Sequence, residues 1–105
     1  MKPDLSQLLA LADALGNPHR LRVIAALASG RQHVSGLARE LGLSRPLLYM
    51  HLEKLERAGL VAGSLELSED GKAMKYFELR PFEWRLDAQA IVKAVRNAER
   101  AGGDA

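Results

Sequence analysis

The sequence contains no cysteine among its 105 residues. Without thiols, the chain cannot form a disulfide, a thiolate metal site or a thiol redox sensor. Long apolar runs are also missing, because near the N-terminus the longest stretch is 8–12, which Asp13 interrupts. Such a stretch is too short for a signal peptide or a membrane span, so we expect a cytoplasmic protein.

The chain also lacks a strong charge of either sign, with a formal net charge of +2 at pH 7. The charge is unevenly distributed, because residues 1–60 contain eight Lys or Arg and five acidic residues, whereas residues 61–105 contain seven and eight. This small excess of basic residues in the N-terminal half is compatible with contact between that half and phosphates. With 48% hydrophobic residues, the chain is expected to fold as one domain over 1–101, followed by a frayed tail at 102–105.

The stretch 34–61 contains two short helical patterns separated by Gly42, which can adopt the left-handed conformation that ends a helix. Ser35 is placed to cap the first helix and Ser44 to cap the second. Each pattern has an apolar stripe on one face, formed by Leu37, Ala38 and Leu41 in the first and by Leu48, Leu52 and Leu55 in the second. Two short helices joined in this way predict a helix-turn-helix at 34–58, whose second helix lies in the major groove of DNA.

The outward side of the second helix determines which residues could contact DNA. These candidates are Ser44, Arg45, Pro46, Leu47, Tyr49, Met50 and Lys54. An arginine can form a bidentate hydrogen bond with guanine, and apolar side chains can contact thymine methyl groups. The alternative is that Leu47, Tyr49 and Met50 form an apolar surface that packs on another protein or subunit.

Two further helices are predicted before this stretch. The first runs from Asp4 to Leu15, and the second begins with Asn17 as its cap and Pro18 in its first turn. The expected core faces are Leu5, Leu8, Leu9, Ala12 and Leu15 in the first helix and Leu21, Ile24, Ala25 and Ala28 in the second. Because Leu11 lies outside the first stripe, the first helix has a second apolar side that needs a partner.

A strand pattern follows the helix-turn-helix. Apolar and polar residues alternate after Gly63, and the Asp-Gly dipeptide at 70–71 is typical of a hairpin turn. The sequence therefore predicts a β-hairpin wing at 61–79. Lys72 and Lys75 could contact DNA phosphates from this wing, although an exposed loop also carries lysines for solubility.

A last helix is predicted from 82 to 100, after Pro81 ends the second strand. Two broadly apolar helices at opposite ends of a small domain indicate a homodimer interface, and packing within one chain is the alternative. The residues expected at the interface are Leu5, Leu8, Leu9, Leu11, Trp84, Ile91, Val92 and Val95.

The order helix, helix, helix-turn-helix, wing, helix resembles that of the ArsR/SmtB family of dimeric winged-helix repressors. The likeness is carried by ALGNPHRLRVIAAL (14–27), LARELGLSRPLLYMHLEKLERAGLV (37–61) and GKAMKYFEL (71–79). It implies a mainly α fold with a small β-hairpin wing (α+β), in which four helices precede the hairpin and a fifth follows it. It also implies that a homodimer binds operator DNA until an inducer releases it.

The metal sensing of that family does not carry over to this chain. The family's thiolate site lies where this chain has His33 and Ser35, and its Asp-x-His pattern on the last helix is here Asp87 followed by Gln89. No histidine has a visible ligand partner, and all three are expected at polar surface or boundary positions: His19, His33 and His51. We therefore expect no metal and no other cofactor.

The sequence predicts a DNA-binding transcriptional repressor that acts as a homodimer on an inverted-repeat operator of double-stranded DNA. Its inducer would be a small molecule or a partner protein. The alternative function is a winged-helix module for protein–protein interaction with weak or no DNA binding. An enzyme is not expected, because no Ser/His/acid grouping or glycine-rich phosphate loop stands out.

Overall fold

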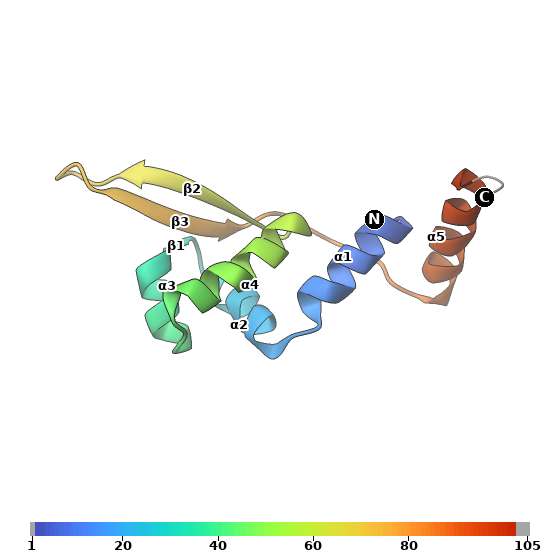
Figure 1. Cartoon of the computed structure of the whole chain (residues 1–105), viewed down its shortest axis with the longest axis horizontal. Helices are drawn as coiled ribbons and strands as arrows, with labels where there is room; N and C mark the ends of the chain where they lie inside the picture. Colours follow the sequence, from blue (N-terminus) through green and yellow to red (C-terminus); the bar gives the residue numbers. More distant parts are fainter. Residues whose placement is uncertain (1, 103–105) are drawn as a thin grey trace.

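The computed structural model describes residues 2–102 (Figure 1). In chain order its elements are α1 (Leu5–Leu15), α2 (Pro18–Leu27), β1 (Gln32–His33), α3 (Val34–Leu41), α4 (Arg45–Arg57), β2 (Val61–Leu67), β3 (Ala73–Leu79) and α5 (Ala88–Ala101). The predicted fold class is confirmed, since the described chain combines five helices with a small antiparallel sheet. Apart from Gly102, the tail expected to fray lies outside the described residues.

The molecule is elongated, with principal extents of 58 × 25 × 22 Å. Helices α2, α3 and α4 form its centre, the β2–β3 hairpin extends to one end, and α5 lies at the other end beyond α1 (Figure 1). Helix α5 packs against α1. No helix within residues 2–102 is long and apolar enough to cross a membrane.

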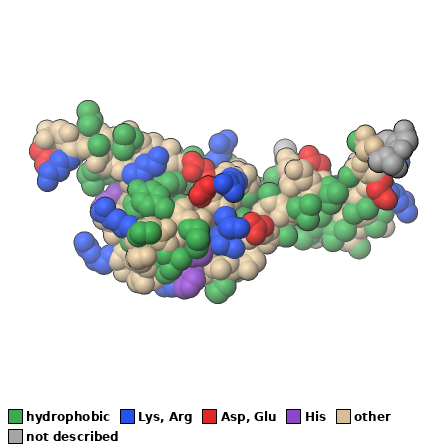
Figure 2. All heavy atoms as spheres, viewed as in Figure 1, with side chains coloured by type: hydrophobic (Ala, Val, Ile, Leu, Met, Phe, Trp, Pro, Cys, Tyr) green, Lys and Arg blue, Asp and Glu red, His purple; other side chains and the backbone are tan. Residues whose placement is uncertain are grey.

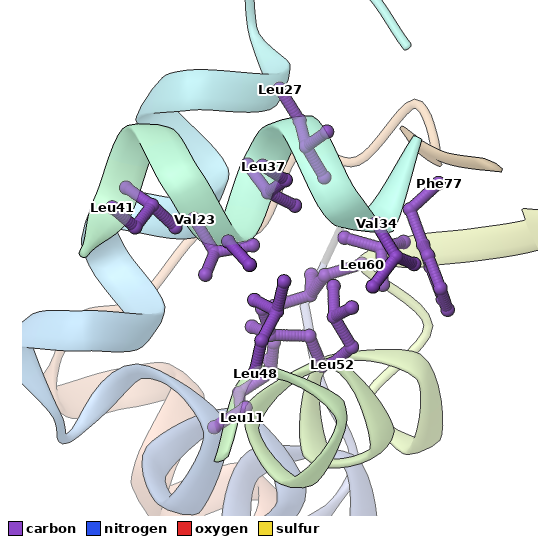
Figure 3. Packing of buried hydrophobic residues seen from close by; sticks show 14 residues of the cluster. Leu11, Val23, Leu27, Val34, Leu37, Leu41, Leu48, Leu52, Leu60 and Phe77 are labelled. Carbon is purple, nitrogen blue, oxygen red and sulfur yellow. The ribbon is translucent and has the colours of Figure 1, made fainter. Parts of the chain in front are cut away.

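The hydrophobic core lies where α2, α3 and α4 meet, and α1 and β3 close it (Figure 3). The apolar stripes predicted for α3 and α4 are confirmed, because all their members are buried: Leu37, Ala38, Leu41, Leu48, Leu52 and Leu55. Each fully buried leucine contributes roughly 1.5–3 kcal/mol relative to an exposed one. These stripes therefore fix the rotation of α4 and determine which of its residues face outward.

The helix starts follow the predicted caps, with one correction. The Ser44 hydroxyl accepts a hydrogen bond from the Leu47 amide (3.3 Å), and Gly42 ends α3 with φ 68°. The cap predicted for Ser35 is wrong, because α3 begins at Val34 and its cap is His33, two residues before Ser35. His33 Nδ1 accepts from the Gly36 amide (3.1 Å). The imidazole nitrogen serves as the acceptor that a serine hydroxyl would otherwise supply.

The sheet contains a third strand that the sequence did not predict. Strand β1 pairs with β3, with Gln32 opposite Phe77 and His33 opposite Tyr76, so the order is β1-β3-β2. A two-residue strand is too short to show alternation. Just before it, the Arg31 guanidinium lies 4.4 Å from the centre of the Tyr76 ring and forms an ion pair with Glu66. These contacts join the wing to the body of the molecule.

The core face predicted for α1 is wrong. Leu11 and Ala14 are the buried residues of this helix, whereas Leu9, from the expected core stripe, is 63% exposed. Helix α1 is apolar on two sides, and the spacing of its leucines does not show which side the chain itself covers. Of the stripe that was expected in the core, Leu15 packs against the core, whereas Leu9 and Ala12 are exposed.

The core face predicted for α2 is also wrong except for Ile24, which packs against the core. Val23, Leu27 and the side chain of Arg20 are buried, whereas Leu21 is 50% exposed. The rotation has a physical cause, because the Arg20 guanidinium reaches inward to bond the last carbonyl groups of α1. Because Arg20 is charged, its residue type suggests a surface position, but its hydrogen bonds hold the side chain inside the protein.

The last helix begins later than predicted. Residues 82–87 are not helical, and α5 starts after Asp87, whose carboxylate accepts a hydrogen bond from the Ala90 amide (2.8 Å). Trp84 precedes the helix and packs against the core. Helix α5 buries Ala90 and Ala94, while its larger apolar residues are exposed: Ile91, Val92 and Val95.

Candidate nucleic-acid interface

The outward side of α4 carries an exposed apolar patch near its N-terminal end. Leu47 is 37% exposed, Tyr49 43% and Met50 49%. In Figure 2, hydrophobic side chains gather over α4 with Lys and Arg side chains on both sides. An isolated exposed leucine is ordinary, but three such residues within four positions form a surface that needs an occupant.

A groove of about 450 Å³ lies between the start of α3, the wing and α4. The structure brings four of the predicted DNA-contact residues together in its lining: Arg45, Tyr49, Lys72 and Lys75. No acidic residue lines it. The groove therefore offers three cationic side chains and one phenol to a polyanion, in a concave site of mixed helix and hairpin origin.

Two contacts shape this groove. The Arg45 guanidinium donates a hydrogen bond to the Ser35 hydroxyl, so the side chain reaches from α4 toward the start of α3. On the wing, Lys75 Nζ lies 5.5 Å from the centre of the Phe77 ring. A Cβ at Gly63 would lie 2.9 Å from an atom of that ring, so only glycine lets the aromatic side chain pack here.

The acidic residues at the wing tip are not part of the groove. Asp70 accepts a hydrogen bond from the Ser68 hydroxyl, which lowers the pKa of the aspartate, as does the Lys72 amide to a smaller extent. Glu69 is exposed at the turn. The negative charge of the wing turn thus lies at the tip, beside Lys72, and no acidic side chain lines the groove that contains Arg45.

Lys54 is separated from the other predicted contacts. Its ammonium group forms an ion pair with Asp13 of α1 (2.8 Å), and it does not line the groove. The hydrogen bond from Lys54, followed by its charge, lowers the pKa of the Asp13 carboxyl below its usual 3.8. Lys54 therefore connects α4 to α1, an arrangement that the helical pattern could not show.

Sequence reasoning missed a buried polar pair beside α4. Arg20 donates to the carbonyl oxygens of Ala14 (2.8 Å) and Asp13 (2.9 Å), and its Nη1 lies 3.1 Å from His51 Nδ1. His51 was expected at the surface but is only 3% exposed. Its position beside the leucine stripe of α4, three residues after Leu48, was the signal that could have indicated burial.

The environment of His51 keeps the ring neutral. Burial lowers the pKa of His51, and the charges of Arg20 and His19 lower it further. Because Arg20 can only donate, His51 Nδ1 accepts and the proton of the neutral ring is on Nε2. That nitrogen is buried and has no hydrogen-bond partner among the described residues. The pair thus joins the C-terminal end of α1 to α4 through an uncharged imidazole.

A second groove, of about 510 Å³, lies between α1 and the segment before α5. Its lining is almost entirely apolar and includes three of the predicted dimer residues: Leu8, Leu11 and Trp84. Leu11 is 7% exposed and belongs to the core of its own chain, so it forms the floor of this groove. Among residues 2–102, no three His, Asp or Glu side chains are grouped so that they could hold a metal ion.

Comparisons with known proteins agree with this geometry. Residues 17–62 match the family model described as bacterial regulatory protein, arsR family. The HTH-type transcriptional regulator MJ0229 of Methanocaldococcus jannaschii is 36% identical over 93 residues, which are 89% of this chain and 97% of the relative. The segment matched by the family model, residues 17–62, contains α2, α3 and α4 in full.

Solved structures show the same fold. Mb0332 of Mycobacterium bovis, a homodimeric winged helix-turn-helix domain, superposes with a TM-score of 0.65 at 22% identity, covering 96% of this chain and 88% of that one. The repressor BigR of Xylella fastidiosa gives 0.59 at 22% identity, covering 95% and 89%. The chain belongs to the ArsR family and is a transcriptional regulator with a winged helix-turn-helix DNA-binding domain.

Proposed function

We propose that this regulator is a homodimeric repressor that inserts α4 into the major groove of an inverted-repeat operator. The observation that supports this most directly is the groove whose lining contains Arg45, Tyr49, Lys72 and Lys75 and no acidic side chain. Helix α4 supplies the base contacts, and the wing lysines bind phosphates beside them. Ser44 and Pro46 set the start of α4, so their role is to position the helix on the DNA.

The proposal of a homodimer is supported by the open apolar sides of the terminal helices. Leu9 is 63% exposed, and Ile91, Val92 and Val95 of α5 are each at least 38% exposed. A second copy would cover these residues by a two-fold arrangement. Two α4 helices related in this way read half-sites one helical turn apart, about 34 Å, which is why the operator is an inverted repeat.

The inducer is proposed to be an organic molecule or a partner protein rather than a metal ion. The absence of cysteine removes the softest ligands, and the histidines have other roles, since His33 caps α3 and His51 pairs with Arg20. Calorimetric titration with zinc, nickel and copper should show only weak binding. One stoichiometric site per subunit with nanomolar affinity would contradict this proposal and would direct attention to His33.

A shift assay on the DNA beside the protein's own gene tests the main proposal. Electrostatic contacts to phosphates release counterions, so the logarithm of the binding constant should fall linearly with the logarithm of salt concentration. A module that uses the exposed patch of Leu47, Tyr49 and Met50 to bind protein is the second candidate. It predicts weak DNA binding without sequence preference, and that result would replace the repressor proposal.

Arg45 separates base reading from phosphate binding. If its guanidinium reads a guanine, Arg45→Ala should cost about 1–3 kcal/mol on the operator and relax the preference at one position per half-site. If it binds a phosphate, all sequences should weaken alike and the salt slope should fall by about one unit per monomer. We favour base reading, because the exposed neighbours of Arg45 and Tyr49 at this end of α4 are apolar and cannot donate hydrogen bonds to bases.

A matched control exists on the same helix. Arg57 is exposed and paired with Glu53 (2.5 Å), so Arg57→Ala removes an arginine from α4 without touching the groove. It should change operator affinity much less than Arg45→Ala. Normal operator affinity and specificity in the Arg45→Ala, Tyr49→Ala double variant would end the proposed role of α4.

A further inference from the structure

The part of α4 that projects from the protein has few groups that can hydrogen-bond with bases. Residues 45–57 contain no Asn, Gln, Ser or Thr, so the usual bidentate partners of adenine are missing. Lys54 is engaged with Asp13. Among the exposed side chains of the first two turns, only Arg45 and Tyr49 carry a donor, because His51 is buried. Hydrogen bonds therefore cannot specify more than a small part of a half-site.

Leu47 and Met50 occupy the positions where such hydrogen-bonding residues would stand. They are three residues apart, about 60° around the helix, so they form one patch in the first two turns of α4. Leu47 is 37% exposed and Met50 49%. The major groove of DNA offers one apolar group to such a patch, which is the C5 methyl of thymine.

Charge next to the patch favours DNA over an apolar protein as the occupant. Tyr49 joins the patch to the groove that contains Arg45, Lys72 and Lys75, and no acidic side chain lines that groove. A purely apolar protein surface would leave these three cations without counter-charges. Phosphates beside a thymine supply both the counter-charge and the methyl group in one molecule.

We infer that Leu47 and Met50 are specificity-determining residues that contact thymine methyl groups in each operator half-site. The inference rests on the proposed DNA binding by α4, and it names the base chemistry that α4 selects. Burial of one methyl group against an aliphatic side chain corresponds to about a fourfold gain in affinity. The contacted thymines lie beneath the first two turns of α4, next to the guanine that Arg45 reads.

Deoxyuridine provides the test, because it keeps every hydrogen-bonding group of thymine and lacks only the methyl. The full-length protein is first used to select its preferred duplex from a random pool. Each thymine of that duplex is then replaced in turn by deoxyuridine, and binding is measured by fluorescence anisotropy. We expect a loss of about fourfold at one or two thymines per half-site and no change at the others.

Variants assign the effect to side chains. For each of Leu47→Ala and Met50→Ala, there should be one thymine position at which replacement by deoxyuridine no longer weakens binding. The salt dependence of binding should stay as in the original protein. Leu21→Ala is the matched control, because Leu21 is a 50% exposed leucine on α2, away from the groove. It should retain full discrimination between thymine and deoxyuridine.

The outcomes separate this inference from the function on which it rests. If the protein selects a preferred duplex but tolerates deoxyuridine at every position, the methyl contacts are refuted and the repressor proposal stands. If the alanine variants keep the discrimination, Leu47 and Met50 are not its source and the inference is wrong. If no duplex is selected and binding has no salt dependence, both proposals fail together.

Discussion

Two apolar surfaces of this molecule look alike by exposure and differ in the elements that form and border them. The first is the patch of Leu47, Tyr49 and Met50 on α4. The second, here called the terminal surface, is formed by exposed residues of the first and last helices: Leu9, Ile91, Val92 and Val95. Tyr49 of the α4 patch lines a groove that α4 shares with the wing, with three cations and no acid, whereas Val92 lines a groove with Lys2, Lys93, Arg96 and Arg100.

This difference shows that exposed hydrophobic area alone does not identify a partner. Beside the wing, an apolar patch with cations at its border suits the edge of a DNA base, because phosphates neutralise that charge. The terminal surface is formed by helices from the two ends of the chain, outside the helix-turn-helix and the wing, and a second copy of the chain is the simplest source of an apolar surface to cover it. The two surfaces are also connected, because Arg20 and His51 join the end of α1 to α4.

The largest effect is expected from a charge placed on the terminal surface. Ile91 is 43% exposed in the single chain, so Ile91→Glu should leave the monomer folded but bury a carboxylate in the dimer interface. Loss of the second half-site should reduce operator affinity by about a hundred- to ten-thousandfold. Sedimentation and shift assays would measure both changes.

The control for this variant is Gln89→Glu, which adds the same charge at another exposed position of α5. It should remain a dimer with unchanged operator affinity. If Ile91→Glu also stays dimeric at micromolar concentration, the terminal surface is not the dimer interface, and the distinction between the two surfaces fails.

The next largest effect is expected from removing Arg20, which joins α1 to α4, and this change should lower the stability of the fold. Arg20→Met removes the donor to the carbonyl groups of Asp13 and Ala14 and to His51. Buried acceptors left unpaired cost about 1–3 kcal/mol each, so we expect a loss of about 3 kcal/mol in the free energy of unfolding. Urea denaturation would measure it.

Arg22 provides the comparison on the same helix. It is exposed and its guanidinium donates to the Leu41 carbonyl (3.2 Å), so Arg22→Met should cost about 1 kcal/mol. Equal losses for the two variants would mean that the burial of Arg20 adds nothing to the connection between α1 and α4.

The same connection should respond to pH. Burial, with the charges of Arg20 and His19, lowers the pKa of His51 below its usual 6.5 in the folded protein. The unfolded chain therefore binds a proton at this residue first, and the stability that the neutral ring contributes is present above pH 6.5. It should be lost progressively as the pH falls below 6.5 and through the folded-state pKa.

Unfolding midpoints between pH 7.5 and 5 would measure this loss, and NMR titration of the His51 ring would locate its pKa. His51→Gln is the control, because its side-chain oxygen can still accept from Arg20 and does not titrate in this range. The variant should show a shallower dependence on pH. An unchanged slope would assign the pH dependence to other groups.

Much of the centre of the fold was predictable because its physical signals are local. The turn at Gly42, the cap at Ser44 and the leucine stripes of α3 and α4 each require only neighbouring residues, and the structure agrees with all of them. The outward direction of Arg45 and Tyr49 follows from those stripes. Their proximity to Lys72 and Lys75 also followed from the order of elements, since a hairpin directly follows α4.

The remaining features depend on contacts between distant residues. Nothing beside Arg20 in the sequence indicates that its guanidinium reaches the end of α1, and this contact fixes the rotation of α2. Helix α5 begins at Ala88 rather than at 82 because Trp84 packs on the core first, which the helical spacing of apolar residues could not show. Strand β1 exists only through its pairing with β3.

The smallest effect should come from Lys54, which tests how sharply the cationic groove ends. Its ammonium group is held by Asp13 of α1 and lies outside the groove, whereas Lys75 lines it. An exposed ion pair contributes little, so Lys54→Ala should change operator affinity less than about twofold and leave the salt slope unchanged. Lys75→Ala is the matched variant, and it should reduce the slope by about one unit per monomer, because one phosphate contact is lost from each wing. Measurement of both variants over a range of salt concentrations makes the comparison direct. If Lys54→Ala lowers the slope as much as Lys75→Ala does, the cationic surface that binds DNA extends along α4 to α1, and the groove is not its boundary.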